Sequence, residues 1–557
     1  MSENITDILK REGPCLSSTV VRILVNEHRL SPEAARQRVK RRPSEIRSLD
    51  RLPFPRNAKF LYLQSDYGAP AFWKGLTQAL EESSPAYAAA LAALTERGGI
   101  LPRNHFAIAS GAPVAQQGHM SSQTILYRLI EAKLLEEFDV PGIGVCIGYA
   151  RNDVAHFALQ IEQMKARLIV ETIMLEAVKK WARNLGLGSF NKFMVRDEGE
   201  LPRVGTFAWD LTAPSYIAPL RGKSNTGKPN PGFLACDMLL GRVITEAGIQ
   251  PFLRKCTTLQ SLKKIGRCLY IFVANGYSPK ALNAARRAGI LPASPESLFG
   301  SEVAEAFVEL TKILTGAANA AVDPEKFDWL FKKLGKIEGV ALSLRGVLFE
   351  FVVGDLVRKL WGAQVQLNYK VREGGVEVAE VDVLAVLSNR CIHFIECKGQ
   401  APHQTVNDDE VKTWLTKRVP VVREHALKHP EWKHLKMHFE LWTSGKLSDE
   451  AVTLIKEAQQ GISPNKYAVH HRSGDDINDL ANELKDETLK RVIRTHFLEH
   501  PFSADEFLEP LAPEFFQVPV NGEVPSRSDV AITHTPKPLQ IEHAKDAVGQ
   551  AVLRQAK

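Results

Sequence analysis

The sequence predicts a multidomain protein that combines α+β and α/β domains, and three observations support this prediction. The chain has 557 residues, 44% of them hydrophobic, which is enough for three or four domains with cores of their own. An internal repeat of helix and strand patterns fills the middle of the chain. The residues before it have a different pattern of short helices, turns and basic side chains. We expect an N-terminal helical part, two related α/β domains and a short C-terminal appendage.

The N-terminal pattern is a helix, a turn and a basic helix. A helical run covers Ser17 to Asn26, and a second helix begins with Ser31 as N-cap and Pro32 at its first position. An alternating strand pattern follows at residues 59–63. This order resembles a winged helix-turn-helix, in which the second helix enters a DNA groove and its cations meet phosphates. The resemblance implies five nucleic-acid-binding residues, namely Arg36, Arg38, Lys40, Arg41 and Arg42. A solvated basic helix that binds nothing is the alternative.

A second unit follows the first. Helical patterns lie near residues 73–82, 85–97 and 121–138, with a hairpin around 142–149. We expect either a second winged-helix-like unit or a helical adaptor that binds protein.

Two strand patterns further along the chain bring acidic and basic residues together. The run Val376 to Leu387 places Glu380 and Asp382 on one face, and after a tight turn a second run ends in Glu396 and Lys398, again on one face. Pairing these strands would place two carboxylates and an ammonium group at one edge of a sheet. Mg²⁺ prefers such a partial carboxylate cage, completed by water and phosphate oxygens.

The order of a helical Glu350, then Asp382, then Glu396 and Lys398 resembles the PD-(D/E)xK nuclease superfamily, which has the restriction-endonuclease-like fold. The matching stretches are RGVLFEFVVGDLVRKL, EVDVLAV and HFIECKG, within about residues 338–460. The resemblance implies that Asp382, Glu396 and Lys398 are catalytic, and that Glu350, Asp382 and Glu396 bind Mg²⁺, for which Mn²⁺ can substitute. In this chain a glutamate stands near the aspartate where the family often has proline.

The resemblance implies a metal-dependent endodeoxyribonuclease that hydrolyses phosphodiester bonds in duplex DNA, in a bacterial defence or restriction setting that includes partner proteins. Two alternatives stay open. One is a non-catalytic DNA-binding regulator, because an isolated Glu-x-Lys on a strand is usually an ordinary charge pair. The other is a metal-dependent ribonuclease.

The internal repeat predicts a second, earlier domain of the same kind. Residues 170–180 align without a gap with residues 349–359, and 270–276 align with 439–445. The aspartate strand of the first copy then contains Asp210, and the positions that match Glu396 and Lys398 are predicted to be Ala235 and Asp237. With no lysine there, we expect a degenerate copy that serves in DNA binding or dimerisation, with residual metal binding through Asp210 and Asp237 left open.

The remaining features limit the function classes. The net charge of +7 permits nucleic-acid binding. The seven cysteines form no Cys-x-x-Cys pair, which disfavours zinc ribbons and agrees with a reducing cytosol. We expect His393 and His403 to lie on a surface and bind no metal, since no second histidine recurs at ligand spacing. A signal peptide and membrane spans are absent from the pattern, so a cytoplasmic protein, monomeric or homodimeric, is expected.

The expected domain bounds follow from these patterns. They are 1–68 for the winged helix, 69–155 for the second unit, 156–305 for the degenerate copy, 325–470 for the nuclease domain and 471–557 for the appendage. The appendage is expected to begin with a polar helix over residues 475–498 and to contain a hairpin around residue 521.

Overall fold

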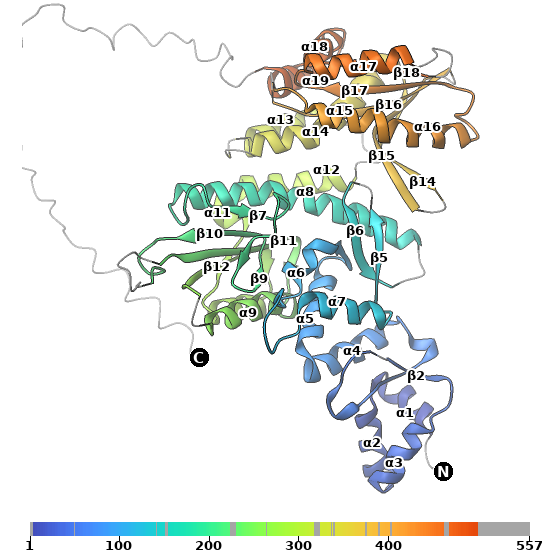
Figure 1. Ribbon diagram of the computed structural model, residues 1–557, viewed down its shortest axis with the longest axis vertical. Coiled ribbons are helices and arrows are strands. Elements are labelled where there is room, and N and C mark those ends of the chain that lie inside the picture. The colour runs from blue at the N-terminus through green and yellow to red at the C-terminus, as the bar shows by residue number, and fades with distance from the viewer. Residues whose placement is uncertain are drawn as a thin grey trace, which may run out of the picture. The chain divides into compact units, whose positions relative to one another are not determined.

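The computed structural model contains helices and five β-sheets within the residues it describes (Figure 1). No helix among these residues is both long and apolar enough to span a membrane. The predicted tail hairpin near residue 521 and His403 lie outside the described residues. The described ranges are 4–49, 51–140, 142–150, 154–222, 230–262, 265–316, 323–335, 337, 340–373, 376–387, 390–401, 404–461 and 467–499.

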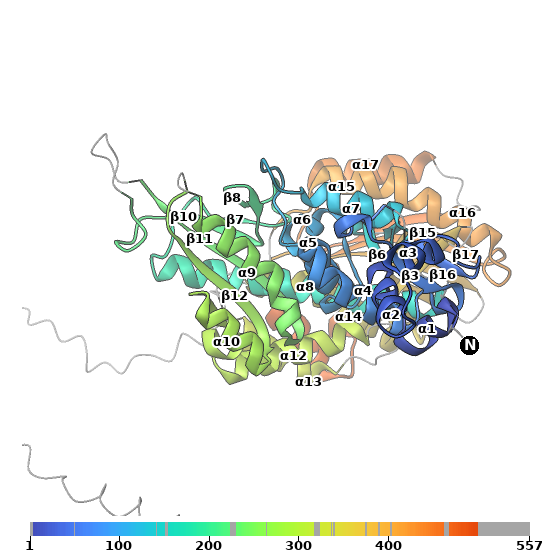
Figure 2. The same cartoon turned by 90° about the horizontal axis from the view of Figure 1, so that it is seen from below.

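The N-terminal unit has three helices and a small antiparallel sheet in the order β1-β3-β2 (Figures 1 and 2). Both predicted helices are confirmed, and the Ser31 side chain accepts the N–H of Ala34 at 3.2 Å. The strand near residue 60 is wholly buried, because it is the central strand of the sheet. The elements are α1 (Ile5–Glu12), β1 (Cys15–Leu16), α2 (Ser17–Asn26), α3 (Pro32–Lys40), β2 (Ile46–Leu49) and β3 (Phe60–Leu63).

The second unit repeats this sheet order as β4-β6-β5. The helix predicted at 121–138 is wrong in its second half. A left-handed turn at Lys133, with φ of 58°, follows the helix, and the next residues form a strand. The elements are α4 (Pro70–Ser83), α5 (Pro85–Glu96), β4 (Ile100–Pro102), α6 (Phe106–Ala109), α7 (Ser122–Glu131), β5 (Leu135–Val140) and β6 (Gly144–Tyr149).

A five-stranded mixed sheet follows, in the order β13-β12-β11-β10-β7. The pairs β7/β10 and β10/β11 are antiparallel, whereas β11/β12 and β12/β13 are parallel. Helix α8 packs on one face of this sheet and α9 on the other (Figure 1). The elements are α8 (Val154–Asn184), β7 (Met194–Val195), β8 (Arg203–Val204), β9 (Phe207–Ala208), β10 (Leu211–Ser215), β11 (Gly232–Ile244), α9 (Glu246–Gln260), β12 (Cys268–Tyr277), α10 (Pro279–Arg287), β13 (Leu291–Ala293), α11 (Pro295–Phe299) and α12 (Ser301–Thr315).

The last described part forms a second five-stranded sheet, β14-β15-β16-β17-β18, with the same succession of two antiparallel and two parallel pairs. Helix α14 covers one face, and α15, α16 and α17 cover the other. The elements are α13 (Pro324–Leu334), α14 (Val340–Trp361), β14 (Gln364–Glu373), β15 (Val376–Leu387), β16 (Cys391–Lys398), α15 (Asp408–Thr413), α16 (Val419–Lys428), β17 (Lys436–Thr443), α17 (Asp449–Gly461) and β18 (Ala468–Arg472).

The two halves of the internal repeat therefore have the same fold. A long helix, two antiparallel connections and two parallel crossovers follow one another in both copies. The helices after β12 and β17 both begin with a serine cap: Ser278 accepts the N–H of Ala281 at 3.2 Å, and Ser448 accepts that of Ala451 at 2.9 Å. The predicted alignment of residues 270–276 with 439–445 matches β12 with β17, and each of these strands lies next to the last strand of its own sheet.

The chain after β18 was predicted to be one polar helix over residues 475–498, and this is wrong. It forms α18 (Gly474–Asn482) and α19 (Glu487–Ile493), because Asp486 caps a new helix by accepting the N–H of Leu489 at 2.9 Å. Apolar residues of both helices pack in the same hydrophobic core as α13 and α14.

Candidate metal and phosphodiester site

Strand pairing brings the three predicted catalytic residues together at one edge of the second sheet. Val383 pairs with Ile395, so Asp382 lies next to Glu396 across the ladder. Asp382 Oδ2 accepts the backbone N–H of Cys397 at 2.8 Å, which fixes the carboxylate against β16. The Lys398 ammonium lies 3.1 Å from Glu396 Oε1.

Glu350 joins this edge from α14. The helix comes close to the end of β16 because residue 399 is glycine: a Cβ there would lie 2.4 Å from the carbonyl oxygen of Arg345, one turn before Glu350. Glu350 and Asp382 line the same cavity of about 450 Å³. The small residue after the lysine thus sets how closely the helix and its carboxylate approach the strand.

The carboxylates at this edge crowd one another. Burial, and then the neighbouring Glu396, raise the pKa of Asp382 to about 7. Burial followed by the charge of Asp382 raises the pKa of Glu350 well above its usual value. Burial alone would lower the pKa of Lys398, but the adjacent Glu396 and Asp382 outweigh it and raise that pKa. Burial and crowding therefore favour the protonated form of Asp382 and Glu350 in the absence of a bound cation.

Sequence patterns missed one group that touches the site. Arg418, in the helical turn Trp414–Arg418, forms an ion pair with Glu396. Arg418 comes from the segment after β16, so only the crossover that returns this segment over the sheet could have indicated it. Glu410 of α15 also reaches the site, 3.6 Å from the Lys398 ammonium.

A second missed group comes from the first copy. Lys165 of α8 lies 2.6 Å from Glu380 Oε2, and Lys370 pairs with Glu162 of α8. Glu162 and Lys165 line the same cavity as Asp382, together with Gly142 and Ile143 between β5 and β6. The carboxylate edge of the second copy therefore faces α8.

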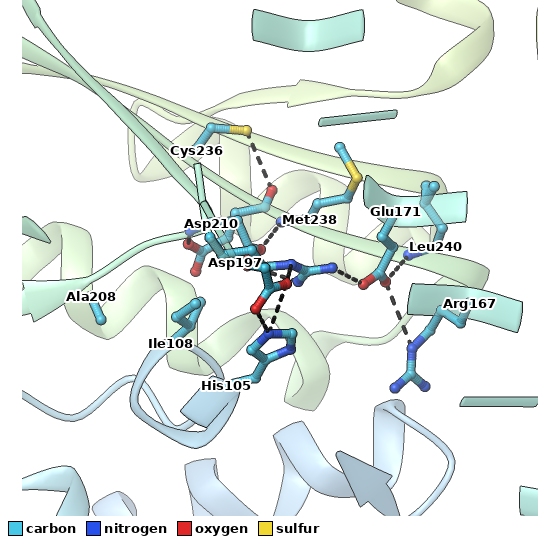
Figure 3. Close-up of polar contacts among 12 residues, drawn as sticks. His105, Ile108, Arg167, Glu171, Asp197, Ala208, Asp210, Cys236, Met238 and Leu240 are labelled. Atoms are coloured by element: carbon cyan, nitrogen blue, oxygen red, sulfur yellow. Dashed lines mark hydrogen bonds and ion pairs between the residues drawn. The ribbon is translucent and has the colours of Figure 1, made fainter. Parts of the chain in front are cut away.

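The first copy holds an equivalent set of carboxylates with cations bound inside it. Arg196 donates to Asp210 at 2.8 Å and to Glu171 at 2.6 Å, and all three side chains are buried. Figure 3 shows Glu171 and Asp210 within this cluster of polar contacts in the first copy. The neighbouring charges of Asp210 and Glu171 raise the pKa of Arg196 despite its burial, so it stays charged.

The register of the first copy corrects the predicted equivalence. Asp237 lies opposite Phe272 on β12, just as Glu396 lies opposite Leu441 on β17, so Asp237, and not Ala235, corresponds to Glu396. The N–H of Met238 donates to Asp210 at 2.7 Å, matching the bond from Cys397 to Asp382. The predicted alignment was therefore displaced by two residues. Leu239, and not Asp237, corresponds to Lys398, and its side chain is buried in the core.

A lysine does reach the first copy, from α9. The fully buried Lys255 forms an ion pair with Asp237 and donates to the carbonyl oxygens of Ile108 at 3.1 Å and Ala208 at 2.9 Å. Lys255 follows its strand on the crossover helix, as Arg418 follows β16. Burial raises the pKa of Asp237 to about 6, although Lys255 opposes the shift.

The five predicted nucleic-acid-binding residues fall into two groups. Arg36, Lys40 and Arg41 are exposed on or just after α3, with Arg36 3.9 Å from Glu33, and Arg38 is partly exposed beside them. Arg42 instead donates to the carbonyl oxygen of Ile46 at 3.3 Å and to Ser48 Oγ at 3.0 Å. Arg42 therefore holds β2 against the end of the helix.

Comparison with known proteins gives little. No protein-family model matches the chain, and no curated protein matches it. Among solved structures, the restriction endonuclease FokI aligns over 83% of this chain and 82% of its own, with 11% sequence identity and a TM-score of 0.19. At this TM-score the two chains do not superpose as wholes.

Proposed function

We propose that this protein is a metal-dependent nuclease that hydrolyses phosphodiester bonds in DNA at the edge formed by Asp382, Glu396 and Lys398. The observation that supports this most strongly is the crowding of buried carboxyl groups there. In the first copy the equivalent carboxylates are neutralised by buried Arg196 and Lys255. In the second copy burial and mutual repulsion raise the pKa values of Glu350 and Asp382, which a bound cation would relieve.

These residues fit a hard divalent cation. Glu350, Asp382 and Glu396 would hold Mg²⁺, or Mn²⁺ in its place, because carboxylate oxygens are the ligands these ions prefer. When bound, the ion would polarise a phosphoryl oxygen and acidify a water molecule.

Each protein group has a role that its position allows. Lys398 would orient the attacking water or stabilise charge on the phosphate, since its ammonium projects beside Glu396. Arg418 is about half exposed, at 47%, and can contact a phosphate while it pairs with Glu396. The Cys397 N–H keeps Asp382 aligned with the site.

The N-terminal units support DNA as the substrate. Each has helices followed by an antiparallel hairpin in the same sheet order, as in a winged helix, and α3 exposes several cations. We propose that the first unit binds duplex DNA through Arg36, Arg38, Lys40 and Arg41. A defence or restriction role with partner proteins rests on the resemblance of the motif alone.

The test is cleavage of end-labelled duplex DNA, single-stranded DNA and RNA of one sequence, with Mg²⁺ or Mn²⁺. Wild type should cut duplex DNA, and Lys398→Ala should not. Lys436→Ala is the matched control, because Lys436 is an exposed lysine at the opposite end of the same sheet. Preferential cutting of RNA would mean that the substrate is RNA and not DNA. Binding without cutting, in either metal, would contradict the proposal.

A further inference from the structure

A group of soft metal-ligand side chains lies on the second sheet, away from the carboxylate edge. Cys391 and His393 come from β16, and His438 comes from β17, directly beside His393 in the ladder. One ligand atom from each residue lies within 4.8 Å of the other two. The imidazoles of His393 and His438 stack with centroids 4.5 Å apart and planes 8° apart. All three side chains are partly exposed.

One histidine of the group is held in the orientation of a metal ligand. His393 Nδ1 lies 2.5 Å from Glu440 Oε1, and Glu440 is 2% exposed. Trp442 Nε1 donates to the other Glu440 oxygen at 2.9 Å, which fixes the carboxylate. With the proton of His393 on Nδ1, its Nε2 lone pair is directed at the group, 3.5 Å from Cys391 Sγ. A carboxylate behind a histidine is the usual support of a histidine that binds zinc.

The donor set selects the class of metal. A thiolate and two imidazoles suit Zn²⁺ and similar ions, whereas Mg²⁺ requires oxygen ligands. Tetrahedral zinc with bonds of about 2.0 to 2.3 Å has donor atoms about 3.3 to 3.8 Å apart, so small side-chain rotations would close the group around an ion. A fourth ligand is at hand in His470 of β18, whose Nε2 lies 3.4 Å from His438 Nδ1.

The group is separate from the carboxylate edge. Cys391 and His393 are odd-numbered residues of β16, whereas Glu396 and Lys398 are even-numbered, so the two sets lie on opposite faces of the strand. His393 contacts Trp361 of α14, with ring centroids 4.9 Å apart, which places the group on the face that α14 covers. The expectation that His393 binds no metal considered only spacing along the chain, whereas His438 arrives through the parallel crossover.

We propose that Cys391, His393 and His438 form a binding site for a zinc-class transition-metal ion that links β16 to β17, and to β18 when His470 joins. The ion is independent of the Mg²⁺ of the proposed nuclease. It would stiffen the end of β16 that lies away from Glu396 and Lys398.

The experiment uses the full chain, reduced and free of metal, titrated with ZnCl₂ and separately with CoCl₂. We expect one equivalent of Zn²⁺ per chain, a raised Tm, and a Co²⁺ spectrum with a thiolate charge-transfer band and intense visible bands of a tetrahedral site. Cys391→Ser should remove the charge-transfer band and the Tm rise, and His438→Gln should weaken Zn²⁺ binding by at least about tenfold.

Three further variants show whether the metal binds at this group and nowhere else. Cys268→Ser changes a partly exposed cysteine of the first copy and should behave as wild type. Asp382→Asn should abolish cleavage and leave Zn²⁺ binding unchanged, so failure of one proposal is distinguishable from failure of the other. Glu440→Gln should weaken Zn²⁺ binding by about 10- to 100-fold and keep the charge-transfer band. A Co²⁺ spectrum with no thiolate band, or Zn²⁺ affinity equal in wild type and Cys391→Ser, would overturn the proposal.

Discussion

The two copies of the α/β fold hold equivalent carboxylates but differ in the groups that surround them. In the first copy Glu171, Asp210 and Asp237 are buried with Arg196 and Lys255 between them. In the second, Glu350 and Asp382 line a cavity, and burial, followed by the neighbouring carboxylates, raises their pKa values. In the first copy an internal arginine therefore occupies the position that corresponds to the proposed metal ion of the second copy.

The largest effect that we expect is on the cleavage rate, and it should differ between variants of the two copies. Asp382→Asn should lower the cleavage rate about 10³-fold or more, because a bound ion contributes several kcal/mol of transition-state stabilisation. Asp210→Asn changes the equivalent residue of the first copy and should leave the rate per folded molecule within about threefold of wild type. Single-turnover cleavage of duplex DNA measures both. Equal losses in the two variants would mean that the copies share the reaction.

The next effect is on the free energy of unfolding, which should also differ between variants of the two copies. Arg196→Met leaves Glu171 and Asp210 buried without their cation and should lower the free energy of unfolding by about 3 to 5 kcal/mol. Arg418→Met is the matched change in the second copy. Because Arg418 is about half exposed, we expect a loss below about 1 kcal/mol. Urea unfolding followed by circular dichroism gives both values, and an undiminished stability of Arg196→Met would remove the proposed role of its guanidinium.

A third effect depends on pH in the metal-free protein. The pKa of Asp382 is raised to about 7 in the folded state, against about 3.9 when unfolded, so the folded state binds more protons between these values. The free energy of unfolding of wild type should therefore fall as the pH rises from about 4 to 7. The free energy of unfolding of Asp382→Asn should not fall in this way. The asparagine side chain also keeps an acceptor for the Cys397 N–H.

In EDTA at pH 8, Asp382→Asn should be more stable than wild type by about 1 to 3 kcal/mol, since one pKa unit corresponds to about 1.4 kcal/mol. The advantage should shrink toward pH 4. Thermal unfolding across this pH range measures it, with Asp210→Asn as the control, which should lose stability because Arg196 loses a partner. A variant less stable than wild type at pH 8 would contradict the repulsion inferred at the second copy.

The weakest effect concerns DNA binding and leaves both copies intact. Changing Arg36, Lys40 and Arg41 together to glutamine should weaken duplex binding and reduce the slope of log K against log salt by about 1 for each phosphate that the protein no longer neutralises. Arg42→Gln removes a cation that already holds β2, and it should change the slope less. Fluorescence anisotropy at several salt concentrations measures the slopes. An unchanged slope in the triple variant would show that α3 does not bind the DNA.

Local patterns predicted the parts of the structure that adjacent residues determine. Alternation along residues 376–387 and the short turn after them placed Asp382 beside Glu396, and the repeat placed Glu171 at the position of Glu350. The two-residue displacement at Ala235 arose because β11 is apolar on both faces, so alternation could not set its register.

The groups that neutralise the carboxylates, and one histidine of the proposed zinc-class site, come from distant elements. Arg196, Lys255 and Arg418 are separated from their carboxylates along the chain by loops or crossover helices. His438 meets His393 only across a parallel ladder. Spacing along one chain does not indicate such pairings.

Binding of Mn²⁺ would distinguish the two copies in a single experiment. The full chain at pH 8 would be titrated with MnCl₂ while free Mn²⁺ is followed by electron paramagnetic resonance, in wild type, Asp382→Asn and Asp210→Asn. We predict that Asp382→Asn loses the tight Mn²⁺ site and that Asp210→Asn keeps it, because Arg196 already occupies the first copy. Loss of Mn²⁺ binding in Asp210→Asn, with binding retained in Asp382→Asn, would mean that the metal binds in the first copy and that the proposed nuclease site is wrong.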